Sequence, residues 1–303
     1  MTEWLISLEG TAAGARLAMM LALTSALAHA VFGALQKGRH DPWITRGAID
    51  AWIAIFAAPL ALFVVPWPQG AEWAVLAGAL VIHLAYKVTM ALAYERAAYT
   101  VVYPVVRGTG PLATLAFAAL FLAEDYAPLQ WLGVAMLSGA ILGLAAVNLR
   151  AASIGRGALV AGLAWAFAGG LLVAVYTTYD AWGIRLMPDP FTFLAWFFLI
   201  TALDFPVLVA LRLWHGVGAG LPARLAPLVL RGAVGALVAF VSFGGVMLAT
   251  RLGKVGEVAA LRETSTLFAA LIGWAVLGEK VGPLRAGLMA VVAAGAVMVQ
   301  VAG

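Results

Sequence analysis

The stretch that decides the fold is RAAYTVVYPVVRGTGPLATLAFAALFLAEDYAP, residues 96–128, because the chain contains a second copy of it. Residues 251–283, RLGKVGEVAALRETSTLFAALIGWAVLGEKVGP, align to this stretch without a gap at a constant offset of 155. The matched positions include Arg96 with Arg251, Arg107 with Arg262, Thr109 with Thr264, Glu124 with Glu279 and Pro128 with Pro283. Shared apolar composition does not explain matched arginines. We therefore interpret the chain as two copies of one unit, a pattern typical of transporters with internal repeats.

The composition is that of a polytopic membrane protein. Hydrophobic residues make up 64% of the chain and charged residues 11%, whereas a soluble domain carries about 25% charged residues. A helix needs about 20 apolar residues to cross the hydrocarbon core of a bilayer, and lipid leaves no partner for unpaired backbone groups. We predict ten helical spans, at about 16–36, 45–65, 73–94, 98–122, 128–148, 157–178, 190–211, 229–249, 255–277 and 284–301.

The predicted fold class is therefore all-α integral membrane, with ten transmembrane helices as a 5+5 inverted-topology repeat around a central cavity. Five spans in each half make the second copy enter the membrane from the opposite side, and ten spans place both termini on one side. The predicted divisions are a leader at 1–15, a first five-helix repeat at 16–150, a linker at 151–156 and a second repeat at 157–303.

Ionisable side chains within the spans are the candidates for a site. A charged group at the bilayer centre costs about 2.5–3.5 kcal/mol on insertion scales, so it normally faces a cavity or a partner. His83, Tyr86 and Lys87 share one face of the third span, and Tyr103 and Arg107 share one face of the fourth. Because the repeat places Arg107 and Arg262 at matching depth, both are candidates to face a transport path.

These residue types suit an anionic solute. A guanidinium presents a fork of donors that fits a carboxylate or phosphate. Tyrosines and Trp165 would supply apolar walls with polar tips, and Glu257 would receive an ammonium group, which favours an amino acid. The alternative is structural: Glu257 and Glu263 share a helix with Arg262, and Glu95 or Asp204 would pair with the other cations. A lone His29 on an apolar helix also fits a hydrogen bond between packed helices.

The run from Tyr94 through YPVVRGTGP, residues 103–111, to Leu122-Ala123-Glu124, with Leu277-Gly278-Glu279 in the second half, resembles the drug/metabolite transporter superfamily, in its ten-helix branch of amino-acid and metabolite exporters. The resemblance covers about residues 16–301. It implies secondary transport by alternating access through a central cavity. The substrate-binding positions it implies here are His83, Tyr86, Lys87, Tyr103, Arg107, Trp165 and Arg262. From the residue types alone, His29, Glu257 and Glu263 are candidates for coupling or ion pairing.

Orientation stays open at this stage. Most loop Lys and Arg residues lie on the side opposite the termini, so the positive-inside rule places both termini outside the cytoplasm. Members of the superfamily usually keep both termini in the cytoplasm, which contradicts that count. The loop after the second span, residues 65–70, also lacks the basic residues usual in the family.

The sequence thus predicts an inner-membrane secondary transporter, an exporter of amino acids or similar small metabolites. The alternatives are a carrier of phosphate- or phosphonate-bearing metabolites and a passive facilitator or channel. An intramembrane enzyme is disfavoured, because Gly-x-Ser-x-Gly is absent and the four histidines are widely separated. The chain has no cysteine, and we expect no metal, no cofactor and no nucleic-acid partner. The expected partners are a small-molecule substrate and the lipid bilayer, with the chain acting as a monomer.

Overall fold

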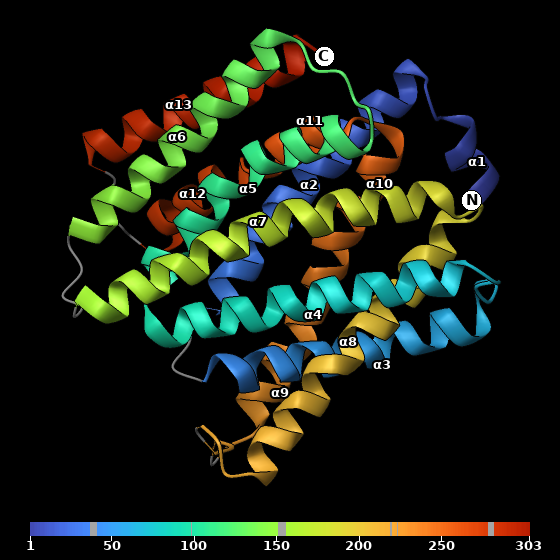
Figure 1. Ribbon diagram of the computed structural model, residues 1–303, viewed down its shortest axis with the longest axis vertical. Helices are drawn as coiled ribbons and strands as arrows, with labels where there is room; N and C mark the ends of the chain where they lie inside the picture. The colour runs from blue at the N-terminus through green and yellow to red at the C-terminus, as the bar shows by residue number, and fades with distance from the viewer. Residues whose placement is uncertain (37–40, 98, 151–155, 219, 223, 278–281) are drawn as a thin grey trace.

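A computed structural model describes residues 1–36, 41–97, 99–150, 156–218, 220–222, 224–277 and 282–303 (Figure 1). Within these ranges all regular secondary structure is helical, and nine segments are long and apolar enough to cross a membrane. The all-α membrane fold is thereby confirmed. Residues 151–155 of the predicted linker and the Gly278-Glu279 motif lie outside the described residues.

The helices follow the predicted spans closely. The first half contains α1 (Thr2–Ser7), α2 (Ala12–Gln36), α3 (Pro42–Phe63), α4 (Glu72–Arg96), α5 (Tyr99–Phe121) and α6 (Pro128–Arg150). The second half contains α7 (Arg156–Leu186), α8 (Pro190–Trp214), α9 (Ala226–Ala239), a π-helical turn η1 (Phe240–Gly244), α10 (Gly245–Leu252), α11 (Val255–Arg262), α12 (Ser265–Leu277) and α13 (Pro283–Val301). The predicted leader is partly helical, since it contains α1 and the start of α2.

One predicted span is broken. The segment at 255–277 is divided between α11 and α12 at Glu263 and Thr264. The hydroxyl of Thr264 donates to the carbonyl of Leu261 (2.7 Å), and that of Thr266 donates to the carbonyl of Glu263 (2.8 Å). Such side-chain bonds compete with the helical ladder. The break falls next to the repeated Arg262, and discontinuous helices commonly form transporter binding sites.

Two equivalent helices begin with the same cap. Asp41 and Asp189 each accept hydrogen bonds from two backbone N–H groups of the following turn, and each precedes a proline at the first helical position. An aspartate cap followed by proline is a strong helix start. The aspartate side chain accepts hydrogen bonds from backbone N–H groups of the first turn that have no partner within the helix, and proline has no N–H group that needs a partner. The caps begin α3 and α8, which are the second long helices of their respective halves.

The helices form one bundle whose neighbour relations repeat between the halves (Figure 1). Helix α5 packs on α7, and α12 packs on α2; α4 packs on α7, and α10 packs on α2. Helices α3 and α8 pack on each other, as do α6 and α13, which lie side by side apart from the α3, α4 and α8 group in Figure 1. In this comparison α2 corresponds to α7, α4 to α10 and α5 to α12. Replacing each helix by its counterpart turns the α5–α7 contact into the α12–α2 contact, and the α4–α7 contact into the α10–α2 contact.

Small residues set the closest approach of α5 and α7. A Cβ added at Gly170 would lie 2.6 Å from the Cβ of Thr109, and one added at Gly110 would lie 3.2 Å from Val173. Small residues allow this kind of helix contact in a bilayer, where apolar side chains gain nothing by leaving lipid. The α5–α7 contact therefore holds the two halves together beside Arg107.

Candidate functional site: a cation-lined central cavity

A cavity of about 270 Å³ lies between the two halves. Its wall is formed by α2, α3, α4, α5, α7, α8 and the η1 turn, and it reaches the beginning of α3 at Pro42 and the end of α4 at Ala97. We call this end of the bundle the cavity end. The opposite end, with the chain termini and the turns α5–α6 and α10–α11, is the terminal end.

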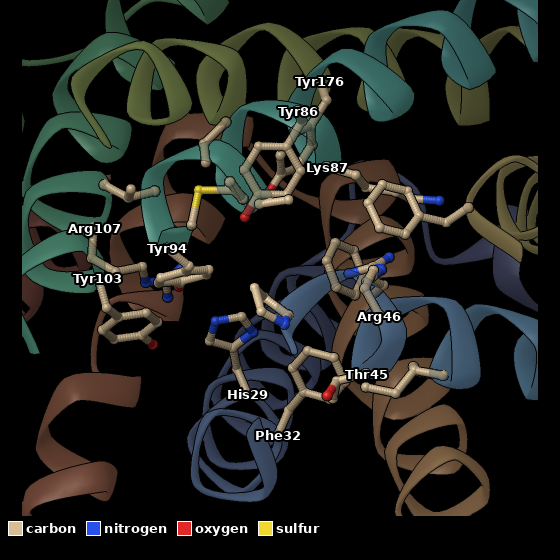
Figure 2. Close-up of a pocket in the computed structure, with 18 of the residues that line it drawn as sticks. His29, Phe32, Thr45, Arg46, Tyr86, Lys87, Tyr94, Tyr103, Arg107 and Tyr176 are labelled. Atoms are coloured by element: carbon tan, nitrogen blue, oxygen red, sulfur yellow. The ribbon is translucent and has the colours of Figure 1, made fainter. Parts of the chain in front are cut away.

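The cavity wall combines aromatic rings with positive charge. Figure 2 places Arg107 and Tyr103 on one side, Arg46 and Lys87 on the other, and His29 and Phe32 on a third. Tyr86, Tyr94, Tyr176, Phe205 and Phe243 supply most of the remaining aromatic surface. Among the described residues that line the cavity, none is acidic. This wall suits a small solute with an apolar body and a negative group.

The Lys87 network closes one side of the cavity. Lys87 Nζ donates to Asp50 Oδ2 (2.8 Å), to Asp204 Oδ1 (2.8 Å) and to the carbonyl of Thr201. Arg46 Nε lies 2.9 Å from Asp50 Oδ1. Two cations and two carboxylates from α3, α4 and α8 therefore balance one another. Lys87 has all three donors engaged, whereas the side chain of Arg46 is 24% exposed, so Arg46 is the cation of this network that a solute reaches.

The Arg107 network occupies the opposite side, at the break between α11 and α12. Arg107 Nε lies 3.0 Å from Glu263 Oε2, and its Nη2 donates to the carbonyl of Arg262 (3.2 Å) and to Ser265 Oγ (2.9 Å). The two arginines that the repeat equates thus contact each other. Glu263 neutralises Arg107 from behind the wall and is not itself on it.

His29 is held between the halves. Its Nδ1 lies 3.3 Å from Ser242 Oγ, and its ring stacks on Tyr103 at a centroid distance of 6.3 Å. The π-helical turn η1 places Ser242 beside His29 and Phe243 on the cavity wall, and single π turns are frequent at functional sites. His29 therefore serves helix packing and also presents a ring to the cavity.

His83 faces a second, smaller set of groups. Its Nε2 lies 2.8 Å from Asp180 Oδ2, and its ring contacts Tyr176 at 4.7 Å. His83 lines a void of about 20 Å³ beside the Lys87 network, not the main cavity. Asp180 and Arg262 line another void, of about 10 Å³, on the terminal side of Tyr176 and Phe243.

The terminal end of the bundle is closed by interlocked loops. Glu124 forms an ion pair with Arg185 Nη1 (2.8 Å) and accepts hydrogen bonds from Val255 N (2.8 Å) and from the hydroxyl of Tyr126. Burial and the hydrogen bond to Glu124 raise the pKa of Tyr126, which keeps this hydroxyl a donor at physiological pH. Arg185 also donates to the carbonyls of Thr250 (2.9 Å) and Gly253 (2.8 Å).

A second set of contacts lies beside those of Glu124, and we call the two sets together the terminal clamp. Arg251 pairs with Glu9 (2.6 Å) and donates to the carbonyls of Ile184 and Met187, the latter at 2.8 Å. Lys254 donates to the carbonyl of Asp125 (2.9 Å). The end of α7, the α5–α6 turn and the α10–α11 turn are thereby tied together, so the bundle is closed toward the terminal end.

The sequence-predicted residues are distributed unevenly. His29, Tyr86, Lys87, Tyr103 and Arg107 line the main cavity, whereas His83 and Arg262 lie in the adjoining voids and Glu263 lies behind Arg107. Trp165 does not line the cavity and instead packs under Arg96, with Cζ 6.0 Å from the ring centroid. Glu257 lies at the terminal end, where it accepts a hydrogen bond from Gln130 (2.8 Å), and it is not among the residues that line the cavity.

Sequence reasoning missed several wall residues. Arg46 falls in the predicted span at 45–65 but is not among the predicted site residues, and the Asp41 cap starts α3 early enough to place Arg46 inside the helix. Its spacing of four residues from Asp50 was a visible signal of a helical ion pair. Asp180 lies beyond the predicted end of its span, because α7 continues to Leu186.

Membrane-length helices around an internal cavity define a multi-pass membrane protein. The family model of EamA-like transporters matches residues 160–301, which confirms the resemblance to the drug/metabolite transporter superfamily and indicates a membrane transporter of small solutes.

Other comparisons bear on the fold. A solved structure titled "Crystal structure of protein" superposes with a TM-score of 0.75 at 18% sequence identity, over 94% of this chain and 96% of that chain. That likeness extends the shared fold over nearly the whole chain, including the first half that the family model does not reach. No curated protein matches the sequence.

Proposed function

We propose that this protein is a secondary carrier of small anionic solutes, above all carboxylates, and that it works by alternating access. The observation that carries the proposal is the cavity wall, where Arg46, Lys87 and Arg107 are the charged groups and the described lining residues include no carboxylate. The acids that neutralise these cations lie behind the wall, at Asp50, Asp204 and Glu263. A charge-assisted hydrogen bond to an arginine contributes about 1.5–3 kcal/mol.

The residues that line the cavity favour some classes of solute over others. An amino acid would place its carboxylate on Arg107 or Arg46, but its ammonium would meet tyrosine hydroxyls and ring faces and no acidic side chain. A carboxylate without an ammonium avoids that loss, so it is favoured over a zwitterion. Phosphonates are the second candidate, because a guanidinium fork accepts either anion. The cavity of about 270 Å³ limits the solute to a small one.

The closed terminal end favours a carrier over a channel. The repeat equates Arg96, at the cavity end, with Arg251, at the terminal end. The side chain of Arg96 is 37% exposed and that of Arg251 is 7% exposed, because only Arg251 is enclosed by its partners. Equivalent residues in unequal surroundings are what a two-state carrier shows when one end is open and the other shut.

The proposed repeats are residues 16–150 and 157–303, in inverted orientation, rocking about the cavity. The repeated helix contacts and the matching caps of α3 and α8 support this division. We further propose export across the cell inner membrane, as the resemblance implies, and a monomeric protein, because the duplication supplies both halves within one chain. The orientation of the chain in the membrane is set by whether the cavity end faces the cytoplasm or the opposite side.

The test is transport into proteoliposomes of radiolabelled benzoate, phenylacetate, L-phenylalanine and phenylphosphonate. A carrier gives saturable uptake that unlabelled solute inside the vesicles accelerates, whereas a channel shows no such acceleration. The decisive variant combines Arg107→Gln with Glu263→Gln, which removes the cation and its buried ion-pair partner together. Trp165→Phe, outside the cavity, is the control. Uptake of neutral benzamide equal to that of the acids contradicts the proposal.

A further inference from the structure

Arg262 is a buried cation whose side chain lacks a hydrogen-bonding partner among the described residues. It is 3% exposed, and neither its Nε nor its Nη2 has a hydrogen-bond partner. Its guanidinium lies 4.8 Å from the ring centroid of Phe243. Lys87 and Arg107, by contrast, each lie within 3.0 Å of a carboxylate oxygen. Burying a cation without hydrogen bonds is costly, so a position that retains one is a candidate for ligand binding.

The guanidinium faces a defined space, which we call the inner void. Its lining includes Arg262, Asp180, Thr177 and Thr250, and its volume is about 10 Å³. Asp180 Oδ1 also has no hydrogen-bond partner among the described groups, although Oδ2 bonds His83. A space of this volume admits about one water molecule. In this conformation the inner void therefore excludes a solute.

Two aromatic side chains separate the inner void from the main cavity. Tyr176 and Phe243 line both spaces, and their ring centroids are 6.5 Å apart. On its other side, the inner void adjoins the closed terminal end, since Arg185 donates to the carbonyl of its lining residue Thr250. The order along the bundle is thus main cavity, aromatic pair, inner void and clamp.

We propose that Arg262 is a second anion-binding station, which takes the anionic group of the solute from Arg107 once Tyr176 and Phe243 move apart. This inference rests on the proposed function and extends it to the path beyond the main cavity. Arg107 donates to the carbonyl of Arg262, so the two guanidinium-bearing residues adjoin. The transfer requires only side-chain movements and breaks no covalent bond.

The repeat gives the second station its physical reason. Arg107 and Arg262 occupy equivalent positions of the two copies. Arg107 lines the space open to the cavity end, and Arg262 lines the space adjoining the terminal end. If rocking exchanges the surroundings of the two halves, Arg262 in the opposite state lines the open cavity and Arg107 is enclosed. Each arginine then serves the solute from one side of the membrane.

The test compares binding with transport in the full-length protein. The variant is Arg262→Gln, with Arg224→Gln, an exposed arginine, as the matched control. Binding of the panel acids is measured by calorimetry in detergent, and counterflow is measured in proteoliposomes. We expect Arg262→Gln to bind within about twofold of wild type and to lose at least about tenfold in counterflow, the factor for one charged hydrogen bond. The Arg107→Gln, Glu263→Gln variant loses both.

The outcomes separate the inference from the proposed function. If wild-type protein binds no acid, the proposed function fails. Wild-type counterflow in Arg262→Gln overturns the second station while leaving the carrier intact, and loss of binding in that variant places Arg262 in the first site. Thermal unfolding gives an independent readout, because the Nε and Nη2 groups of Arg262 make no hydrogen bond that the substitution would break. A marked fall in that temperature assigns Arg262 a structural role and refutes the proposal.

Discussion

The Lys87 network offers a sharp test of how this bundle tolerates buried charge. Lys87 is the shared cation of Asp50 and Asp204, at 2.8 Å from each, and its side chain is 3% exposed. In Lys87→Met, Asp50 keeps Arg46 but Asp204 loses its ion pair. Removing one partner of a buried pair costs about 3–5 kcal/mol of unfolding free energy, because the remaining charge is uncompensated.

The double variant Lys87→Met, Asp204→Asn should cost less than the sum of its parts. It leaves Arg46 and Asp50 as a balanced pair and removes the carboxylate of Asp204, whose uncompensated charge destabilises Lys87→Met. Residues in one network typically show coupling of about 0.5–3 kcal/mol, and we expect the upper part of this range because both side chains are buried. Asp204→Asn alone should be the milder single change, since Lys87 keeps Asp50.

The assay is equilibrium unfolding by SDS in mixed micelles, followed by circular dichroism. The control cycle is Arg212 with Glu95, whose nitrogen and oxygen lie 3.4 Å apart and whose side chains are 24% and 35% exposed. Such a partly exposed pair should couple by no more than about 1 kcal/mol. Strictly additive effects for Lys87 and Asp204, or equal coupling in the two pairs, would refute the reasoning.

Because the chain has no cysteine, a single introduced cysteine reports on solvent access at its position. With a membrane-impermeant maleimide, Thr45→Cys on the cavity wall should react from one side of the membrane. Thr177→Cys in the inner void should be protected from the reagent. Adding Glu124→Gln, which weakens the hub of the terminal clamp, should expose Thr177→Cys to the opposite side, and unchanged protection would remove Glu124 from the gate. Gly170→Ala should lower the unfolding free energy by about 1–3 kcal/mol through overpacking against Thr109. Gly139→Ala, whose added Cβ meets nothing within 4 Å, should be neutral or stabilising in the same unfolding titration, and equal losses would discount the α5–α7 contact.

The sequence predicted the helical membrane fold and the span positions because apolar length and proline punctuation are local signals. It did not predict the break at Glu263 and Thr264, although five consecutive polar residues, 262–266, marked the place. Tertiary contacts decide there: Arg107, from the other half, bonds Glu263, Ser265 and the carbonyl of Arg262.

Pairing between distant helices explains the other differences. Lys87 and Arg107 both stood out as intramembrane charges, but whether each faces solute or a carboxylate depends on helices 117 and 156 residues further along the chain. The spacing of residues in the sequence does not tell which distant carboxylate pairs with each cation. Of these pairs, only that of Lys87 with Asp204 was among the predicted alternatives. Trp165 had the right residue type and the right helix, yet it lies outside the described lining of the cavity.

The central claim is that the cavity selects solutes by negative charge. The most direct measurement is the binding of matched acid and amide pairs, such as benzoate with benzamide and L-phenylalanine with its amide, to wild type and to the Arg107→Gln, Glu263→Gln variant. We predict that each acid that binds does so at least about tenfold more tightly than its amide, and that the variant abolishes this preference. Equal binding of acid and amide to wild type, or an unchanged preference in the variant, would contradict the account.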